Sequence, residues 1–313
     1  MKLYQRRKVD PAPIGQPDPY IIKADDGRYY VYATGGPSVE LFSSDALLSG
    51  WRYDGHCLHA PGQHAFWAPS VARLDGKYYM YYSSVLNGAE ANDHAQTMRV
   101  AVSEKPGGPF RYVKDLLPPF SIDSHIVSTP SGLFLFYSVN RYEGERVGTY
   151  IVCDRMTDPL HMEGNPRPIV VPTLPQEIFQ KDRFKPGEDW HTIEGAFYFY
   201  HEGVHFVMYS GAAHVNPTYF VGYATAEGPE DADLRALDWV KYPDPQTFAP
   251  VLYSNDAIEG MGHNSVIFDG GTCYIVYHGR DVVRAADTTG DARCARIDVM
   301  KINGKVLSVT PTP

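Results

Sequence analysis

The sequence predicts an all-β fold, a five-bladed β-propeller in a single domain, and three observations carry this prediction. A degenerate unit recurs five times along the 313 residues. Each unit contains a Gly-ending hairpin turn between β-rich runs, where Gly and Asp tolerate positive φ. No long amphipathic helical pattern interrupts the units. With four strands per unit at spacings of about 50–70 residues, propeller blades fit better than a sandwich.

Each unit begins at a polar or special residue, runs through a short strand into the turn, and continues in an aromatic-rich strand. The five first positions are Asp18, Ala68, Asp123, Glu194 and His263. The corresponding turns are Asp26-Gly27, Asp75-Gly76, Ser131-Gly132, Glu202-Gly203 and Asp269-Gly270. The units fill the chain from residue 1 to residue 313, which predicts one domain. Either the first few residues or the last strand, residues 296–300, is expected to close the ring.

Charge and composition exclude several classes of function. The net charge is −9, from 28 Lys and Arg against 37 Asp and Glu, and no long basic run is present; we therefore expect no nucleic-acid partner and no membrane surface. No stretch approaches the ~20 apolar residues of a membrane span. The basic N-terminus lacks an apolar segment behind it, which predicts a cytoplasmic protein without a signal peptide. The four cysteines are scattered and are expected to be buried thiols rather than zinc ligands.

The first position of the unit is where chemistry is expected. The innermost strand of each propeller blade lines the central channel, so equivalent positions of different blades converge although they are far apart in sequence. Asp18, Asp123 and Glu194 would then face one another, and their pKa values must separate. An ionised base and a protonated acid are what glycoside hydrolysis requires. For a lone Asp before Pro, a turn or cap role is the better interpretation; three acids at one register disfavour it.

The residues at the blade starts resemble glycoside hydrolase family 43 across essentially the whole chain. The matching motifs are Asp18-Pro-Tyr, Phe66-Trp67-Ala68-Pro69-Ser70, Ile122-Asp123-Ser124-His125, Ile193-Glu194-Gly195-Ala196, Gly262-His263-Asn264-Ser265 and Arg293-Cys-Ala-Arg296-Ile-Asp298. The resemblance implies an inverting hydrolase that acts on plant polysaccharides or their oligosaccharide fragments. It implies Asp18 as general base, Glu194 as general acid, and Asp123 as the residue that raises the pKa of the acid and orients it. Members commonly have Pro where Ala196 stands, which changes the stiffness of the backbone but not the acid.

The resemblance also implies contacts to substrate and to an ion. Arg293 matches an arginine that could bind sugar hydroxyls. His263 matches a histidine that stands beside a hydrated calcium in some members; the ion would be calcium or sodium on the propeller axis, held through water, and the chemistry itself would need no cofactor. A satisfied core histidine is the alternative for His263. Trp67 and Phe66 could form an apolar platform under a sugar ring, with core packing as the alternative, especially for Phe66.

Two long insertions, residues 88–96 and 176–190, would roof the funnel and favour a pocket for a terminal sugar. Trp190 and His191 could shape a leaving-group subsite, whereas His201, His205 and His214 receive no role. The expected activity is release of terminal α-L-arabinofuranosyl residues from arabino-oligosaccharides or arabinoxylan fragments. The alternatives are a β-xylosidase, which often carries a further C-terminal β-sandwich, a propeller glycoside phosphorylase, and a non-catalytic carbohydrate-binding propeller.

Overall fold

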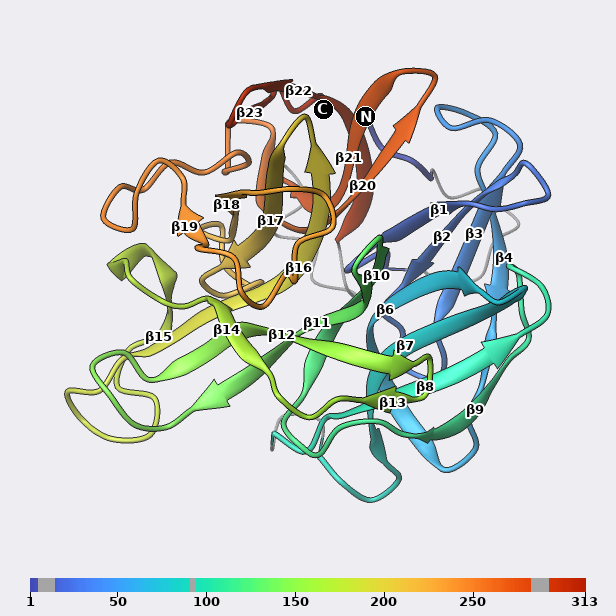
Figure 1. The fold of residues 1–313 in the computed structure, drawn as a ribbon, viewed down its shortest axis with the longest axis horizontal. Coiled ribbons are helices and arrows are strands. Elements are labelled where there is room, and N and C mark those ends of the chain that lie inside the picture. The colour runs from blue at the N-terminus through green and yellow to red at the C-terminus, as the bar shows by residue number, and fades with distance from the viewer. Residues whose placement is uncertain (5–14, 91–93, 283–292) are drawn as a thin grey trace.

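The protein is a ring of β-sheets around a common centre (Figure 1). The computed structural model describes residues 1–4, 15–90, 94–282 and 293–313. Apart from a 3-10 turn, η1 (Pro175–Glu177), the regular elements in these ranges are strands. No helix in the same ranges is long and apolar enough to cross a membrane. The all-β prediction is confirmed.

The strands group into five blades, each beginning with an inner strand and an antiparallel hairpin. The first blade contains β1 (Tyr20–Lys23), β2 (Tyr29–Ala33), β3 (Glu40–Ser44) and β4 (Arg52–His56). The second contains β6 (Gln63–Leu74), β7 (Lys77–Leu86), β8 (Thr97–Ser103) and β9 (Phe110–Asp115), with β5 (Leu58–His59) parallel to β9.

The remaining blades follow the same plan. The third contains β10 (Ile122–Thr129), β11 (Gly132–Arg141) and β12 (Gly148–Asp158), with β13 (His161–Met162) and β14 (Arg167–Val170) paired to β12. The fourth contains β16 (Trp190–His201), β17 (Val204–Gly211), β18 (Phe220–Glu227) and β19 (Val240–Lys241), with β15 (Ile178–Gln180) beside β16. The fifth contains β20 (Ile258–Asp269), β21 (Thr272–Asp281), β22 (Cys294–Asn303) and β23 (Val306–Val309).

The predicted turns lie at the junctions between the first two strands of each blade, and two of them are displaced by one residue. In the third blade the pair Thr129↔Gly132 places the turn on Pro130-Ser131, one residue earlier than predicted. The pair Leu74↔Lys77 flanks Asp75-Gly76 as expected, and both turn residues have positive φ. In the fifth blade the pair Asp269↔Thr272 moves the turn one residue later, onto Gly270-Gly271. Two glycines in a row meet the positive φ of both turn positions without a Cβ penalty, which explains the shift.

Apolar side chains fill the seams between neighbouring blades. The described residues form five clusters, and each cluster joins the strands of two adjacent blades. Tyr30 and Tyr32 pack toward the second blade, whereas Val31 between them packs toward the fifth. Alternate residues of a strand point to opposite faces, so the aromatic-rich second strand of a blade serves two seams. This is why the repeat is rich in aromatics on both faces.

The third and fourth blades are also joined by hydrogen bonding. Strands β12 and β16 pair in parallel through Gly148↔His191 and Thr149↔Thr192. A Cβ on Gly148 would lie 2.0 Å from the carbonyl oxygen of His191, so glycine permits this close approach. The two blades therefore form one continuous sheet, and this pairing brings Thr149 and Thr192 together in the wall of the pocket described next.

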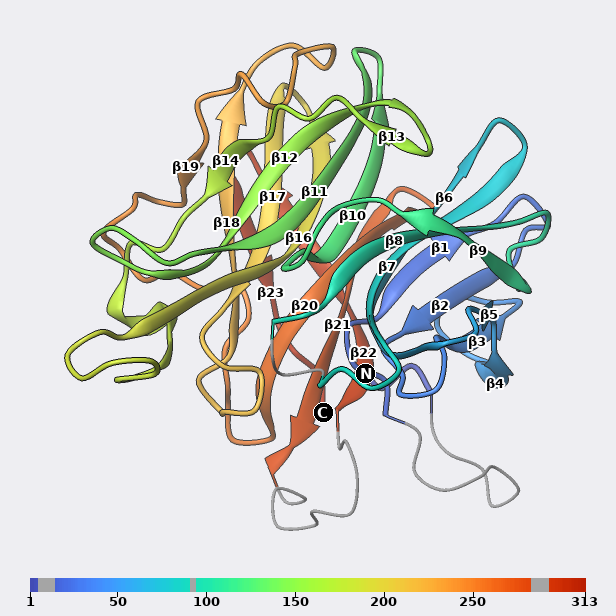
Figure 2. The same ribbon diagram turned by 90° about the horizontal axis from the view of Figure 1, so that it is seen from below.

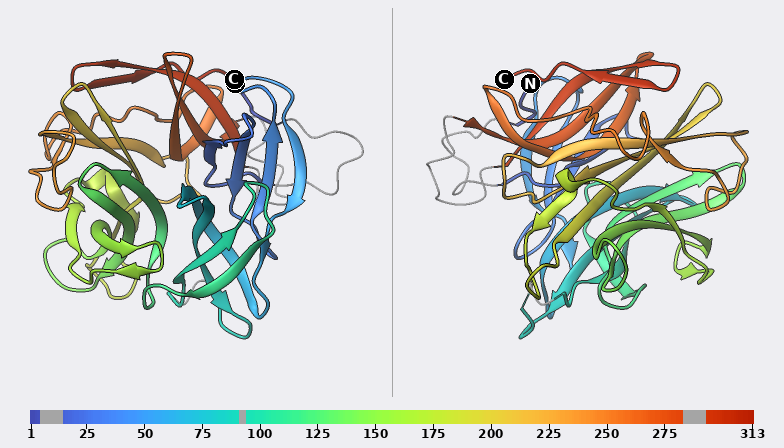
Figure 3. Two further views of the ribbon diagram at one scale, coloured as in Figure 1. Left: turned by 45° about the vertical axis from the view of Figure 1, so that its right-hand side comes forward. Right: turned by 90° about the vertical axis from the view of Figure 1, so that its left-hand side faces the viewer.

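The N-terminal residues and the last strands close the ring together. The amide of Leu3 donates to the carbonyl of Ala295 (2.9 Å), and the amide of Ile297 donates to that of Met1 (2.8 Å). Residues 1–3 thus lie along β22 in the fifth blade, and both chain ends meet there (Figures 2 and 3). Both expected closing segments contribute. Of the four thiols predicted to be buried, Cys57, Cys153 and Cys273 are buried, whereas Cys294 is only partly buried.

Candidate active site

At equivalent places in the five blades, within or just before the inner strand, a residue adopts the left-handed region. These residues are Asp18 (φ 54°), Ala68 (41°), Asp123 (57°), Gly195 (65°) and His263 (48°). In four of the blades a bulge breaks the strand register at this point, as between Ile122 and His125 of β10. Non-glycine residues in this region are strained, and such strain and such bulges concentrate at functional sites.

The register corrects one prediction. Ile122 pairs with Ser138 in the third blade, and Glu194 pairs with Ser210 at the equivalent place in the fourth. Glu194 therefore matches Ile122, and the residue that matches Asp123 is Gly195. The prediction of a shared position is right for Asp18 and Asp123 and wrong by one residue for Glu194.

The steric reason for this shift lies in the fifth blade. A Cβ on Gly195 would lie 3.2 Å from the ring of His263, and the backbone there has φ 65°. Both conditions favour glycine. The acid of the fourth blade consequently occupies the preceding residue, from which its side chain still reaches the central pocket.

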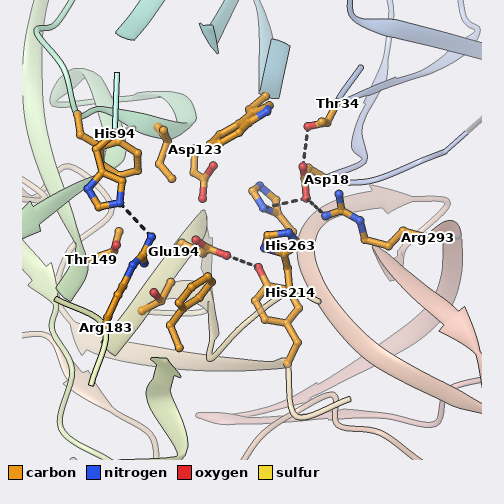
Figure 4. A pocket seen from close by; sticks show the side chains of 16 residues that line it. Asp18, Thr34, His94, Asp123, Thr149, Arg183, Glu194, His214, His263 and Arg293 are labelled. Atoms are coloured by element: carbon orange, nitrogen blue, oxygen red, sulfur yellow. Dashed lines mark hydrogen bonds and ion pairs between the residues drawn. The ribbon is translucent and has the colours of Figure 1, made fainter. Parts of the chain in front are cut away.

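One pocket of about 240 Å³ opens at the centre of the ring and brings the predicted residues together (Figure 4). The three acids Asp18, Asp123 and Glu194 line it, together with the predicted substrate-binding residues. Those that reach the pocket are Trp67, His263 and Arg293.

Phe66 does not line the pocket; it is 1% exposed and packs 5.8 Å from the ring of Tyr82 in the seam between the first two blades. Adjacent strand residues point to opposite faces, so a pocket-facing Trp67 directs Phe66 into the core. The sugar-platform prediction is wrong for Phe66, and core packing is the correct interpretation.

Asp18 is surrounded by hydrogen-bond donors and positive charge. Thr34 Oγ1 donates to its Oδ2 (2.6 Å), and Arg293 lies 3.5 Å from its Oδ1. His263 Nδ1 is 3.3 Å from the same Oδ1 atom. The amide of Asp18 donates to Nδ1 of His278 (3.1 Å), and the same Nδ1 lies 3.3 Å from Oδ1 of Asp18.

These groups keep Asp18 ionised. Burial raises its pKa, but His263, Arg293 and His278 outweigh burial and hold the pKa of Asp18 well below its ordinary value. Burial in turn lowers the pKa of His278 to about 4 and that of His263 below its usual range. Arg293 is thus the partner that keeps its charge at any working pH. An ionised carboxylate of this kind can accept a proton from water.

Glu194 lies in the opposite electrostatic situation. Burial raises its pKa to about 7, and the charge of Asp18 adds to the increase. The hydroxyl of Tyr219 donates to Glu194 Oε1 (2.8 Å) and works against the increase. Tyr219 is 1% exposed, and a Cβ on Gly262 would lie 1.9 Å from its ring, so glycine makes room for this tyrosine.

Asp123 contacts the backbone that carries the acid. Its Oδ2 accepts a hydrogen bond from the amide of Gly195 (3.1 Å), directly after Glu194. Burial raises the pKa of Asp123 well above its ordinary value, and the carboxylates of Glu194 and Asp18 raise it further. The expectation was that a neighbouring carboxylate keeps Glu194 protonated. In the structure burial is the largest cause, and Asp18 is the carboxylate that contributes.

Residues from outside the repeat also line the pocket. His94 comes from the first predicted insertion, and Phe179 and Arg183 come from the second. His214, for which no role is predicted, also lines the pocket. Its backbone carbonyl accepts a hydrogen bond from Arg280 (2.8 Å). No repeat or motif marks these positions, because they lie in segments unique to one blade.

The expected axial ion has no direct ligand set. Within the described ranges, no group of three or more His, Cys, Asp or Glu side chains converges on a point that could hold a metal. His263 instead contacts Asp18 and packs against Gly195. A water-held ion beside His263 stays a prediction, and no step below uses one.

A model of the glycosyl hydrolases family 43 matches residues 12–306. The chain belongs to this family. It is a glycoside hydrolase with the five-bladed propeller of family 43, as the sequence motifs predict.

Individual proteins are similar to this chain over different lengths. An extracellular exo-alpha-(1->5)-L-arabinofuranosidase of Streptomyces chartreusis is 27% identical over 86% of this chain and 83% of its own length. A probable arabinan endo-1,5-alpha-L-arabinosidase C of Aspergillus flavus is 38% identical over 80 residues, which span 23% of this chain and only 25% of that protein. The crystal structure of a thermostable family-43 glycoside hydrolase is 29% identical, with a TM-score of 0.77 over 96% of this chain and 95% of that one.

Proposed function

We propose that the chain is an inverting α-L-arabinofuranosidase that releases terminal arabinofuranosyl residues from arabino-oligosaccharides or arabinoxylan fragments. The proposal rests on one observation: the pocket holds two carboxyl groups, Asp18 and Glu194, whose pKa values are shifted in opposite directions. His263 and Arg293 hold the pKa of Asp18 well below its ordinary value, while burial raises the pKa of Glu194 to about 7. Inverting hydrolysis needs this combination of base and acid.

Each acid then has one task. Asp18 removes a proton from the water that attacks the anomeric carbon, and Glu194 donates a proton to the glycosidic oxygen as the bond to the leaving group breaks. Asp123, through its hydrogen bond to the amide of Gly195, fixes the backbone beside the acid. Arg293 neutralises the charge that Asp18 carries before the water reacts.

The size of the pocket supports action on a terminal sugar. Its volume of about 240 Å³ is below the ~300–1,000 Å³ of sites for drug-sized ligands. Residues of both insertions, His94, Phe179 and Arg183, contribute to its wall. A site walled on several sides suits one chain end rather than the middle of a polysaccharide.

The similar proteins support arabinose as the sugar. The relative that aligns over most of both chains is named as an exo-acting arabinofuranosidase, and the shorter local similarity is to a protein named as an endo-arabinosidase. A β-xylosidase would use the same acid and base, so the sugar has to be decided by assay.

A panel of 4-nitrophenyl glycosides tests the proposal. We expect hydrolysis of the α-L-arabinofuranoside to exceed that of the β-D-xyloside at least tenfold in kcat/KM, without any need for phosphate. A preference for the xyloside would replace the sugar and keep the mechanism. A strict requirement for phosphate would instead indicate a phosphorylase. No hydrolysis of any glycoside, or full activity of Glu194→Ala on an arabino-oligosaccharide, would overturn the catalytic proposal.

A further inference from the structure

Arg183 brings a second positive charge to the pocket. It lies between β15 and β16, and its guanidinium group reaches the wall of the pocket on the side of Glu194 (Figure 4). Arg293 lies on the other side, next to Asp18. The two arginines therefore occupy opposite sides of the three acids.

The surroundings of Arg183 are aromatic rather than acidic. Its guanidinium carbon lies 4.8 Å from the ring centre of Phe179, 5.1 Å from that of Phe184 and 5.3 Å from that of Trp190. Nη2 donates to Nε2 of His94 (3.2 Å), so that imidazole accepts and is neutral at this contact. Among the described residues, no Asp or Glu lies within ion-pair distance of Arg183.

No negative charge among the described pocket residues balances the positive charge of Arg183. Asp18, which is ionised, is neutralised by Arg293. Burial favours the protonated forms of Glu194 and Asp123, the carboxyls on the side of Arg183, because it raises the pKa of both. Burial also lowers the pKa of Arg183, but a guanidinium group stays charged at working pH. Cation–π contacts with the three rings offset part of the cost of partly burying this cation, and an anionic ligand would supply the missing counter-charge.

The chemistry of the group indicates which anion. The planar guanidinium fork matches a carboxylate with two parallel hydrogen bonds. The ring of Phe179, which lines the pocket beside Arg183, offers apolar surface to the C–H face of a sugar. A carboxylate on a sugar ring, as in a hexuronic acid, combines both features.

We propose that Arg183 binds the carboxylate of a hexuronic acid unit in the leaving-group position of the substrate. The inference rests on the proposed function, because Glu194 as general acid defines which side of the pocket the leaving group occupies. The substrate would then be a terminal sugar attached to an acidic, uronate-bearing chain. Arg183 would act in specificity, by recognising what the terminal sugar is attached to.

Two matched disaccharides test this inference in the intact protein. One is the α-L-arabinofuranosyl glycoside of a hexuronic acid, and the other is the same compound with its carboxyl group reduced to the alcohol. We expect kcat/KM to be about tenfold or more higher for the acid, as the loss of one charge-assisted pair would predict. In Arg183→Gln the ratio should fall to about one, while Arg183→Lys should keep part of it.

The control variant is Arg141→Gln, which removes an exposed arginine that stacks on Tyr150 and does not line the pocket. It should leave the ratio unchanged, and melting temperatures should show that each variant is folded. A ratio of one in the wild type, or a ratio that Arg183→Gln leaves intact, would overturn the inference and assign Arg183 to holding its loop. Failure of the proposed function is distinguishable, because the nitrophenyl arabinofuranoside would then not be hydrolysed either.

Discussion

The hydroxyl of Tyr219 donates a hydrogen bond of 2.8 Å to Oε1 of Glu194. The same tyrosine ring stacks on His278, with 5.7 Å between ring centres and 5° between planes. His278 in turn accepts the amide hydrogen of Asp18. The stacked rings of Tyr219 and His278 therefore connect the two residues that we propose as acid and base. With Oε1 engaged by Tyr219, the proton of Glu194 is left on Oε2, the oxygen available to a leaving group.

Tyr219→Phe should shift the pH profile. The Tyr219 hydrogen bond stabilises the carboxylate form of Glu194 and so lowers its pKa. Activity needs the protonated acid, so it is present below the pKa of Glu194, about 7, and is lost as the pH rises through it. Removing the donor should move the alkaline limb of kcat/KM to higher pH. An unmoved limb would mean that Tyr219 does not act on the acid.

The loss of activity in Glu194→Ala should depend on how basic the leaving group is. General acid catalysis contributes about 10²–10⁴-fold in rate, and it matters most when the departing oxygen is basic. We expect a loss of that size on oligosaccharides and a much smaller loss on 4-nitrophenyl glycosides, measured as kcat/KM for a series of leaving groups. Equal losses on both would count against Glu194 as the acid.

Asp18→Asn should be nearly inactive on every substrate, with a loss of about 10²–10⁴-fold attributable to the missing base. The amide keeps the shape and the contact with Thr34 but cannot accept a proton from water. Added azide should not restore a product of retained configuration. A retained azide product would identify a glycosyl-enzyme nucleophile and contradict the inverting mechanism.

Gly195→Ala should reduce activity more than an equally strained substitution elsewhere. The new Cβ would meet the His263 ring at 3.2 Å and disturb its contact with Asp18. Gly203→Ala is the matched control, because Gly203 also has positive φ (88°) but has nothing within 4 Å of its Cβ position. Both variants should be destabilised by about 1–2 kcal/mol from backbone strain, measured by chemical unfolding. Equal activity of the two variants would show that the contact with His263 is unimportant.

Much of the fold could be predicted from the sequence because every blade repeats a hairpin turn followed by an aromatic-rich strand. Turn positions shift by a residue where a second glycine is available, as at Gly271. The pocket residues at the blade starts were identified by the same repeat. The repeat pattern misplaces Glu194 by one residue, because the left-handed position of its blade is Gly195, where a Cβ would lie 3.2 Å from the ring of His263. Sequence propensity does not reveal this contact between blades.

Residues outside the repeat could not be predicted. Arg183 and His214 lie in segments that occur in one blade only, and Tyr219 precedes the third strand of its blade, so no equivalent positions point to the pocket. Phe66 and Trp67 are both aromatic, and only the three-dimensional register separates the core residue from the pocket residue. The cause of the raised pKa of Glu194, burial ahead of neighbouring charge, also depends on tertiary structure.

The configuration of the first sugar released tests the roles of Asp18 and Glu194 most directly. Proton NMR during hydrolysis of the preferred 4-nitrophenyl glycoside distinguishes the two anomers before they equilibrate. Direct attack by water that Asp18 activates predicts that the anomer of opposite configuration appears first, β from an α-arabinofuranoside. Initial formation of the anomer with the substrate's own configuration would require a covalent intermediate and would contradict the mechanism.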